Sequence, residues 1–364
     1  MEPGRAFCLA KVQGMSTRSK YRGAAVAAVL ALTACGGGAT GFAPQAPQAA
    51  ASAQVAAPPA QAPRVPLARP AWYRAAPDAL RKGVYVAEYY TNAILGYNWT
   101  TMQENRPPIC SIPAAYVVNV ATDTAGNLID PDGGSRTVTV FRGPQMCGTA
   151  LGSFSDSAGQ PSDAATTDAA TGTIYVANLQ AAGQPYGNVS ICTLTAGCSG
   201  ILSNSAFGGQ LFAVAEDPSG NVYASGYRNA SGSGASLVEW KGGAGGGSVV
   251  KTYRNTSPGG LDVDKNGKLL ALDTFAGGHG ALWVYSGCAT RCKPHGPFAL
   301  QGESVFGKVN AKGTIFEAAD FEYGQIDVYR YNGVHGITYL YSFGDGLSPS
   351  GDVEGIAINP AASD

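Results

Sequence analysis

The chain has 364 residues, with 24 Lys and Arg, 25 Asp and Glu, and a formal net charge of −1. Charged residues make up 13% of the chain, well below the share of about 25% that is usual in soluble domains. This near balance of charge gives no electrostatic case for nucleic acid binding. The 50 glycines, with many Ser, Thr, Val and Tyr residues, indicate short strands and tight turns rather than helices.

The N-terminal 35 residues have the order of a secretory signal. Three basic residues follow Met15, namely Arg18, Lys20 and Arg22. Residues 23–32 then form an apolar stretch that is too short to span a bilayer. The stretch leads into "LTAC", which resembles a bacterial lipobox and implies that Cys35 becomes the lipid-modified first residue of the mature chain. We expect residues 1–35 to be a signal peptide that starts at Met1 or Met15; an ordinary cleaved signal with a chance cysteine is the alternative.

A tether is predicted after the signal. Residues 36–78 are dominated by Ala, Pro, Gln and Gly, as in "APQAPQAAASAQVAAPPAQAPRVPLARP". Such a composition cannot bury a core, so we expect a disordered and partly extended segment. The folded domain is assigned to residues 79–364. With the lipid, this organisation predicts a protein anchored to a membrane on the extracytoplasmic side of the bacterial cell envelope.

A polar turn recurs along the folded domain, as in "AEDPSGNVYASG" at residues 215–226. Six short apolar segments end in Asp or Asn, at Asp123, Asp168, Asp217, Asp264, Asn310 and Asn359. In the first five a glycine follows within four residues, at Gly126, Gly172, Gly220, Gly267 and Gly313. Asp and Asn accept hydrogen bonds from turn amides, and glycine adopts the positive φ of a tight hairpin. Each unit is predicted to consist of a strand, an Asp-x-x-Gly hairpin and a second strand. We therefore expect these Asp and Asn side chains to stabilise turns rather than to take part in catalysis.

Third and fourth strands follow each hairpin, for example "SLVEW" at residues 236–240 and "SVVKTY" at residues 248–253. The Asp and Asn markers advance by 45 to 49 residues. Four short strands at that period are typical of a β-propeller blade.

The two ends of the domain complement each other. Residues 83–99 supply a second and a third strand without a first, and residues 354–360 are a first strand with nothing after it. Together they complete one blade, so we predict an all-β, six-bladed propeller whose C-terminal strand closes the first sheet and removes its free edge. The stretch "VYVAEYYTNAILGY" resembles propellers of the NHL type. That resemblance implies the fold and leaves the function open, because propellers host many functions.

Six cysteines follow Cys35, and export to an oxidising compartment favours disulfides. The close spacings "CTLTAGC" and "CATRC" favour the pairs Cys192–Cys198 and Cys288–Cys292, which leaves Cys110 and Cys147 to form a third pair. A metal site is the weaker alternative, because neither spacing is C-x-x-C and no His lies beside them.

One face of the predicted propeller gathers acidic and aromatic residues. The starts of first strands and the ends of second strands lie on the same face, opposite the Asp-x-x-Gly turns. Second strands are expected to end at Glu88, Asp132, Asn178, Asp273 and Asp320, with Asp163 and Glu354 just before first strands and nearer the axis. Aromatic surface is expected from Tyr89, Tyr90, Tyr186 and Tyr227. These acids are candidate ligand-binding residues, although acids at strand ends also cap their own hairpins.

Two classes of function fit this face. The first is a non-catalytic binding or interaction module for a small-molecule, glycan or protein ligand. The second is a metal-dependent lactonase or esterase, because "EGIAIN" resembles the first-strand Glu motif of gluconolactonase and senescence-marker propellers. That resemblance implies a divalent cation, Ca²⁺, at Glu354, and oxygen ligands at the positions that Phe212 and Gly259 occupy here. Neither residue can ligate a cation through its side chain.

Nucleophile and base motifs are missing from the sequence. There is no G-x-S-x-G or H-x-x-x-H pattern, and His279, His295 and His335 each stand near glycines, where solvated turns are expected. The sequence therefore favours the binding module, with no catalytic residue assigned and with the metal and the ligand open.

Overall fold

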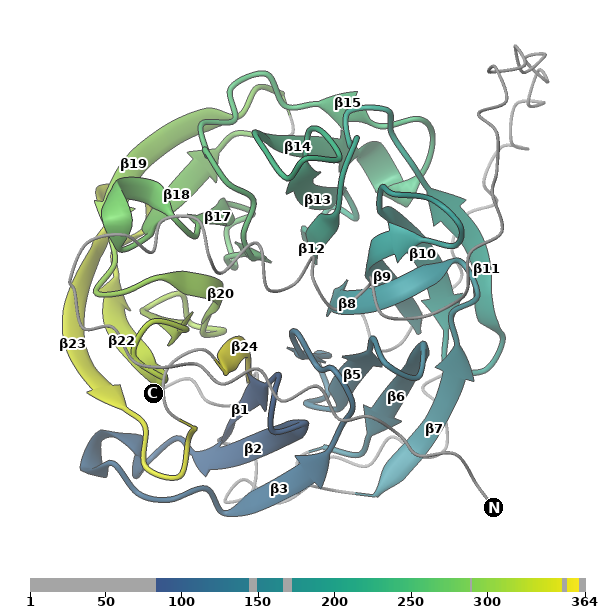
Figure 1. Cartoon of the computed structure of the whole chain (residues 1–364). Helices are drawn as coiled ribbons and strands as arrows, with labels where there is room; N and C mark the ends of the chain where they lie inside the picture. Colours follow the sequence, from purple (N-terminus) through teal and green to yellow (C-terminus); the bar gives the residue numbers. More distant parts are fainter. Residues whose placement is uncertain (1–82, 144–148, 166–171, 289, 349–351, 360–364) are drawn as a thin grey trace, which may run out of the picture. The chain divides into compact units, whose positions relative to one another are not determined.

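The computed structural model describes residues 83–143, 149–165, 172–288, 290–348 and 352–359, all of which belong to the unit Arg64–Asp364. Within these ranges the chain forms six antiparallel sheets of four strands each, arranged as a ring (Figure 1). This confirms the predicted all-β, six-bladed propeller. The predicted signal peptide, the lipidated Cys35 and the tether lie outside the described residues.

The blades are named in the order of their second strands along the chain. Blade 1 has strands β24 (Val353–Ile358), β1 (Gly83–Glu88), β2 (Ala93–Asn98) and β3 (Cys110–Pro113). Blade 2 has strands β4 (Ala121–Thr122), β5 (Leu128–Asp132), β6 (Thr137–Phe141) and β7 (Ala150–Ser155). Blade 3 has strands β8 (Gly159–Ala165), β9 (Thr173–Ala181), β10 (Asn188–Thr193) and β11 (Gly197–Leu202).

The second half of the ring follows the same order. Blade 4 has strands β12 (Leu211–Glu216), β13 (Val222–Tyr227), β14 (Ala235–Trp240) and β15 (Ser248–Val249). Blade 5 has strands β16 (Leu261–Val263), β17 (Leu269–Asp273), β18 (Ala281–Ser286) and β19 (Lys293–Ala299). Blade 6 has strands β20 (Ser304–Val309), β21 (Ile315–Asp320), β22 (Gln325–Tyr331) and β23 (Ile337–Phe343).

Closure of the ring depends on the C-terminal strand. Strand β24 pairs antiparallel with β1, with Val84 opposite Ile358 and Val86 opposite Ile356. The first strands of the six blades also contact one another in sequence around the axis. The predicted completion of blade 1 by the C-terminal strand is therefore confirmed, and the edge of β1 is paired rather than free.

The recurring turn has the predicted chemistry. In the turn at Asp217, Oδ1 accepts hydrogen bonds from the backbone N–H groups of Ser219 at 2.8 Å and Asn221 at 2.9 Å, and Gly220 has a φ of 79°. Asp123 repeats this arrangement, with distances of 2.8 and 2.9 Å. The carboxylates of these two turns are thus occupied by their own hairpins. Asp168 lies outside the described residues.

The core lies between blades rather than within them. Five apolar clusters each fill the space between two neighbouring blades, because successive residues of a strand face opposite sides of its sheet. A sixth cluster lies between blades 4 and 5 and also includes Val118 of blade 2 and Phe306 of blade 6. Trp240, Tyr85 and Phe306 are among the largest fully buried side chains, and each such burial stabilises the fold by roughly 1.5–3 kcal/mol.

Two predicted disulfides are present. Cys192 is bonded to Cys198, and Cys288 is bonded to Cys292. The third predicted pair includes Cys147, which lies outside the described residues. The part of the chain that is described contains no helix long and apolar enough to cross a membrane.

Candidate functional site

Acidic residues end the second strands of four blades, as predicted. Glu88, Asp132, Asp273 and Asp320 are the last residues of β1, β5, β17 and β21. Asn178, which was expected at such an end, lies inside β9, since this strand continues to Ala181.

The carboxylate of Asp273 is hydrogen-bonded to the segment that precedes β16. Its carboxylate accepts hydrogen bonds from the backbone N–H of Thr256 at 2.7 Å and of Ser257 at 3.0 Å. The hydroxyls of the same two residues donate further bonds at 3.0 and 2.9 Å. This buried side chain orders the segment before β16 and has little capacity left for a ligand.

Glu88 and Asp132 have similar roles in blades 1 and 2. Glu88 accepts hydrogen bonds from the Thr91 hydroxyl at 2.9 Å and from the backbone N–H of Ser348 at 2.5 Å. Asp132 accepts from the N–H groups of Gly134 at 2.8 Å, Ser135 at 3.0 Å and Ala115 at 3.2 Å. Both acids therefore stabilise loops.

Asp320 is closed off from solvent. One carboxylate oxygen accepts from the N–H groups of Glu322 at 2.9 Å and Tyr323 at 3.1 Å. A Cβ added to Gly302 would stand 2.3 Å from the other oxygen, so only glycine permits this close approach of backbone and carboxylate. Burial, and then the nearby Asp327 carboxylate, raise the pKa of Asp320 to about 7.

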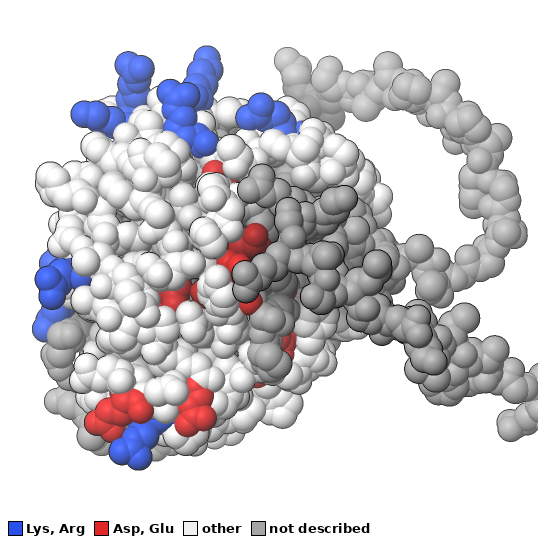
Figure 2. All heavy atoms as spheres, turned by 60° about the vertical axis from the view of Figure 1, so that its left-hand side comes forward, with Lys and Arg blue, Asp and Glu red and all other residues white. Residues whose placement is uncertain are grey.

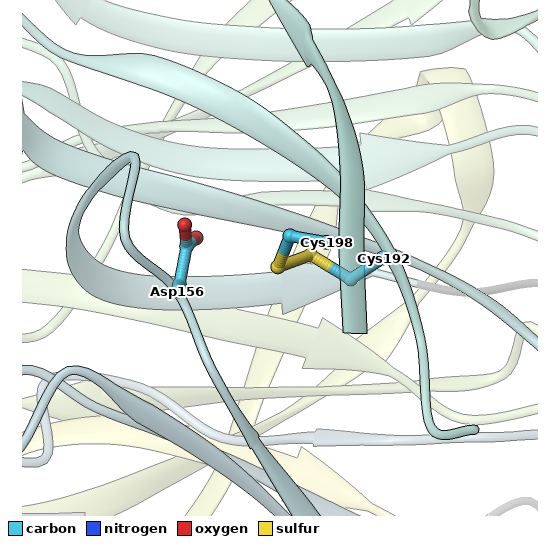
Figure 3. Close-up of side chains that lie close together, drawn as sticks. All are labelled: Asp156, Cys192 and Cys198. Atoms are coloured by element: carbon cyan, nitrogen blue, oxygen red, sulfur yellow. A yellow bond between two sulfur atoms is a disulfide. The ribbon is translucent and has the colours of Figure 1, made fainter. Parts of the chain in front are cut away.

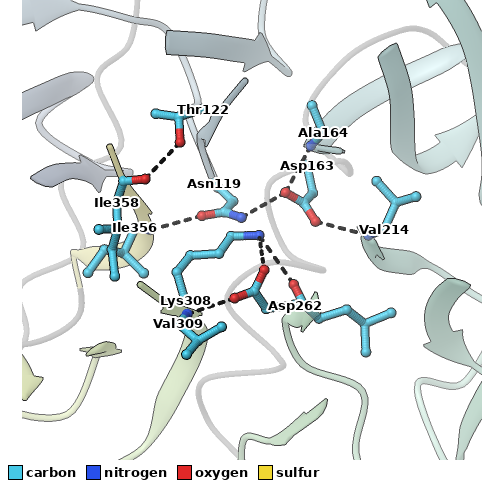
Figure 4. A network of polar contacts seen from close by, with 11 residues as sticks. Asn119, Thr122, Asp163, Ala164, Val214, Asp262, Lys308, Val309, Ile356 and Ile358 are labelled. Atoms are coloured by element: carbon cyan, nitrogen blue, oxygen red, sulfur yellow. Dashed lines mark hydrogen bonds and ion pairs between the residues drawn. The ribbon is translucent and has the colours of Figure 1, made fainter. Parts of the chain in front are cut away.

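Asp163 lies within β8 rather than before it, and it is completely buried. Its carboxylate accepts hydrogen bonds from Asn119 Nδ2 at 2.7 Å, from the N–H of Val214 at 2.9 Å and from its neighbour Ala164 at 2.8 Å (Figure 4). Burial raises the pKa of Asp163 to about 6, against the lowering effects of Lys308 and of these hydrogen bonds. Asp163 thus ties blades 2, 3 and 4 together at the centre of the ring.

Three further polar residues of this central network were not predicted from the sequence. Asn119 Oδ1 accepts the N–H of Ile356 at 2.8 Å, and Asp262 accepts the N–H of Val309 at 2.7 Å. Lys308 Nζ donates to the Leu261 carbonyl at 3.2 Å and lies 3.8 Å from Asp262 Oδ1. Together with Asp163 these residues link the neighbouring blades 1 and 2, 3 and 4, and 5 and 6 around the axis (Figure 4). Their signal in the sequence is a polar residue inside or next to an apolar first strand.

Glu354 differs from every other acid of the predicted set. It lies inside β24, not before it, and it is the extra residue of a β-bulge: Ala87 pairs with Gly355 while Glu88 pairs with Val353. Within the described residues its carboxyl group has no hydrogen-bond or ion-pair partner. Bulges redirect a side chain out of the regular alternation of a strand, and they are frequent at functional sites.

The surroundings of Glu354 disfavour its charged form. The side chain is half-buried, and burial, followed by the neighbouring Asp352 carboxylate, raises its pKa to about 8. Asp352 itself accepts hydrogen bonds from the N–H groups of Tyr90 and Thr91. Glu354 is therefore a partly accessible carboxyl group that no described residue satisfies.

The equivalent bulge in blade 4 holds an aromatic ring. Leu211 pairs with Gly226 and Ala213 with Ser225, which leaves Phe212 as the extra residue of β12. The Phe212 ring packs edge-on against Tyr227 at a centroid distance of 5.3 Å. Gly259 lies just before β16. The side chains at these two positions offer no oxygen ligand to a cation, as the sequence indicated.

One cluster of possible metal ligands occurs among the described residues, formed by Asp156, Cys192 and Cys198. Figure 3 shows that the two sulfur atoms are bonded to each other. Asp156 accepts hydrogen bonds from the N–H of Ala158 at 2.9 Å and from Asn178 Nδ2 at 3.1 Å. A disulfide has no thiolate to offer, so this cluster does not fit a metal ion.

Aromatic side chains concentrate near the end of blade 1 where β24 begins. The Tyr89 ring makes edge contacts with Tyr90 at 5.0 Å and with Tyr116 at 5.7 Å. Tyr90 is 57% exposed and Tyr116 is 49% exposed. Tyr227, predicted to add aromatic surface, is instead buried against Phe212, whereas Tyr186 is exposed as expected.

One side of the domain carries few charges. Figure 2 shows one side of the domain, where uncharged residues dominate, acidic side chains occur in the middle of the view and several basic side chains lie at its edges. His279 lies 3.5 Å from Glu322 in the loops of blades 5 and 6. His295 is part of strand β19, so its assignment to a turn was wrong, and it lies 2.9 Å from the Ser286 hydroxyl.

Comparison with known proteins supports the fold alone. No protein-family model and no curated protein matches the chain. The chain is similar to a solved chain described as "Crystal structure of Nidogen/Laminin Complex", with 14% identity, a TM-score of 0.56, and coverage of 78% of this chain and 100% of the other. It is also similar to a functionally unknown protein from Desulfotomaculum acetoxidans DSM 771, with 12% identity, a TM-score of 0.50, and coverage of 78% and 84%.

Proposed function

We propose that the protein is a non-catalytic binding module, and that its ligand contacts the face of the propeller that carries Glu354 and the neighbouring tyrosines. The observation that supports this most strongly is the unpaired Glu354 carboxyl group. A polar group that is covered without a partner costs stability, so a ligand that covers a partly exposed carboxyl group binds well only when it also supplies the partner. Asp163 and Asp273, two other acids predicted for this face, already have their partners within the protein.

A metal-dependent lactonase or esterase of the gluconolactonase type is the alternative to a binding module. Its support is Glu354, which stands on the first strand of a blade as the resemblance implies. Against it stand the ring of Phe212 at the equivalent bulge and the absence of a side-chain ligand at Gly259. Asp163, the other acid near the axis, is committed to three hydrogen bonds within the protein. The chemistry of binding is therefore favoured over that of hydrolysis.

The proposed place of action is the bacterial cell envelope, with the protein anchored to a membrane on the extracytoplasmic side. The lipobox-like "LTAC" ending at Cys35 and the Ala/Pro/Gln-rich tether support attachment through a lipid, with the propeller held away from the membrane surface. A small molecule, a glycan or a protein of the cell envelope is then the accessible ligand class.

The proposal is tested by binding to arrays of envelope glycans, peptides and small metabolites. Wild-type protein is compared with Glu354→Gln, and Glu104→Gln serves as the matched control, because Glu104 is an exposed acid in the β2–β3 connection, outside the loops that carry the tyrosines. We expect at least one class of ligand to bind the wild-type protein and the control, and to bind Glu354→Gln at least tenfold more weakly. Lactone and ester turnover with Ca²⁺ that is lost in Glu354→Gln would instead establish the hydrolase.

A further inference from the structure

We propose that Glu354, Tyr89, Tyr90 and Tyr116 form a recognition site for an organic ammonium group. This inference rests on the proposed binding function and specifies its ligand class. Three aromatic rings next to one unpaired carboxyl group supply two attractions for the same cation, one to the negative faces of the rings and one to the carboxylate.

The tyrosine cluster is held in place before any ligand arrives. The N–H of Tyr89 donates to the Asp352 carbonyl at 2.9 Å, and the N–H of Tyr90 donates to the Asp352 carboxylate. The N–H of Tyr116 donates to Asn92 Oδ1 at 3.0 Å. Because these bonds fix the backbone of all three residues, little conformational entropy is lost when a ligand binds.

Glu354 and Tyr89 belong to neighbouring segments at the same end of blade 1. Strand β24 begins opposite the end of β1, where Val353 pairs with Glu88, and Tyr89 follows directly. Burial, and then the Glu354 carboxylate, raise the pKa of the Tyr89 hydroxyl. Glu354 and the backbone of Tyr89 therefore lie at the same end of blade 1.

The other charges near the ring axis are compensated. Lys308, from β20, is paired with Asp262, and Asp163, from β8, accepts three hydrogen bonds. Asp352 accepts backbone N–H groups of the β1–β2 loop. Among the described acids near the axis, Glu354 has no partner for its carboxyl group, and a cation would balance the charge of the ionised form. A neutral sugar would require several converging donors and acceptors, which the satisfied acids do not provide.

The probe is choline chloride, because its quaternary ammonium keeps its charge at every pH. Its control is dimethylbutanol, the uncharged isostere in which carbon replaces the nitrogen. Binding is followed by calorimetry and by the NMR signals of the tyrosine rings. The variants are Glu354→Gln and Tyr90→Ala, with Tyr186→Ala as the control, since Tyr186 is an exposed tyrosine of blade 3. Thermal melts confirm that each variant is folded.

We expect choline to bind at least tenfold more tightly than dimethylbutanol, and Glu354→Gln and Tyr90→Ala to lose that preference while Tyr186→Ala keeps it. Because only the ionised carboxylate attracts the cation, affinity should rise roughly 50-fold between pH 6 and pH 8 for a pKa near 8. Equal binding of both probes, or no binding of choline, overturns the ammonium site. If an envelope glycan or peptide still binds in a manner that depends on Glu354, the binding function stands and only the ligand class is wrong.

Discussion

Glu317 provides the sharpest test of the packing between the last blade and the first. This residue lies in β21, is fully buried, and neither carboxylate oxygen has a hydrogen-bond partner among the described residues. It is on the same side of the strand as Ala319, which packs in the apolar cluster between blades 6 and 1. Burial raises the pKa of Glu317 from 4.5 to about 8. The domain therefore folds with this carboxyl group protonated.

The sign of the pH dependence follows from that raised pKa. The folded state binds the proton more tightly than the unfolded state, so the contribution to stability is complete below pH 4.5 and is lost as the pH rises towards 8. At about 1.4 kcal/mol per pH unit, Glu317 should lower the free energy of unfolding by roughly 3 kcal/mol between pH 5 and pH 7. The variant Glu317→Gln has a similar shape and no titratable group, so it escapes this loss.

The assay is urea unfolding of the purified protein and of Glu317→Gln at pH 5, 6, 7 and 8. We expect the variant to gain stability over the wild type by about 2–3 kcal/mol between pH 5 and pH 7. Glu104→Gln is the control, because Glu104 is exposed and its ion pair with Arg106 is worth little. Parallel pH profiles for the wild type and Glu317→Gln would refute the placement of an unpaired carboxyl group in this interface.

Three further perturbations test the ring and its connections. Asp163→Ala should lower the free energy of unfolding by about 2–4 kcal/mol, because it leaves the buried N–H of Val214 and the amide of Asn119 without an acceptor. Urea unfolding measures this loss, and a loss below about 0.5 kcal/mol would contradict the prediction. Deletion from Asp352 onward removes β24 and should lower stability by several kcal/mol; a cooperative melt at the wild-type temperature would argue against closure by this strand. Replacing both Cys288 and Cys292 with Ser should lower the free energy of unfolding by about 2 kcal/mol without unfolding the domain. Thermal melts under oxidising conditions measure this, and an unchanged melting temperature would show that the bond does not stabilise the domain.

Membrane attachment through Cys35 is tested separately by fractionation of cells that express Cys35→Ser. We expect the variant to be released from the membrane or to remain as unprocessed precursor. Normal processing and unchanged membrane association would contradict the lipoprotein proposal.

The fold was largely predictable because its signals are local and repeated. An Asp-x-x-Gly hairpin needs only a few adjacent residues, as at Asp217 and Gly220, and the missing first strand of blade 1 was evident from its counterpart at the other end of the chain. Disulfides between cysteines separated by four and six residues are predictable for the same reason.

The candidate site was less predictable because its properties depend on distant parts of the chain. The partners of Asp163 lie 44 and 51 residues away, so the sequence alone could not show that its carboxylate is already satisfied. The bulge that sets Glu354 apart depends on the register between β24 and β1, which are separated by most of the domain. Their positions in the sequence predicted that both acids lie near the axis. Whether each carboxyl group has hydrogen-bond partners depends on contacts that form only in the folded protein.

The most direct test of the binding account is an NMR titration of the Glu354 side-chain carboxyl carbon, with and without choline. The account predicts a pKa near 8 in the free protein and a decrease of at least one unit when choline is bound, because a neighbouring cation favours the carboxylate. A pKa close to the ordinary value of 4.5 that choline leaves unchanged would contradict it.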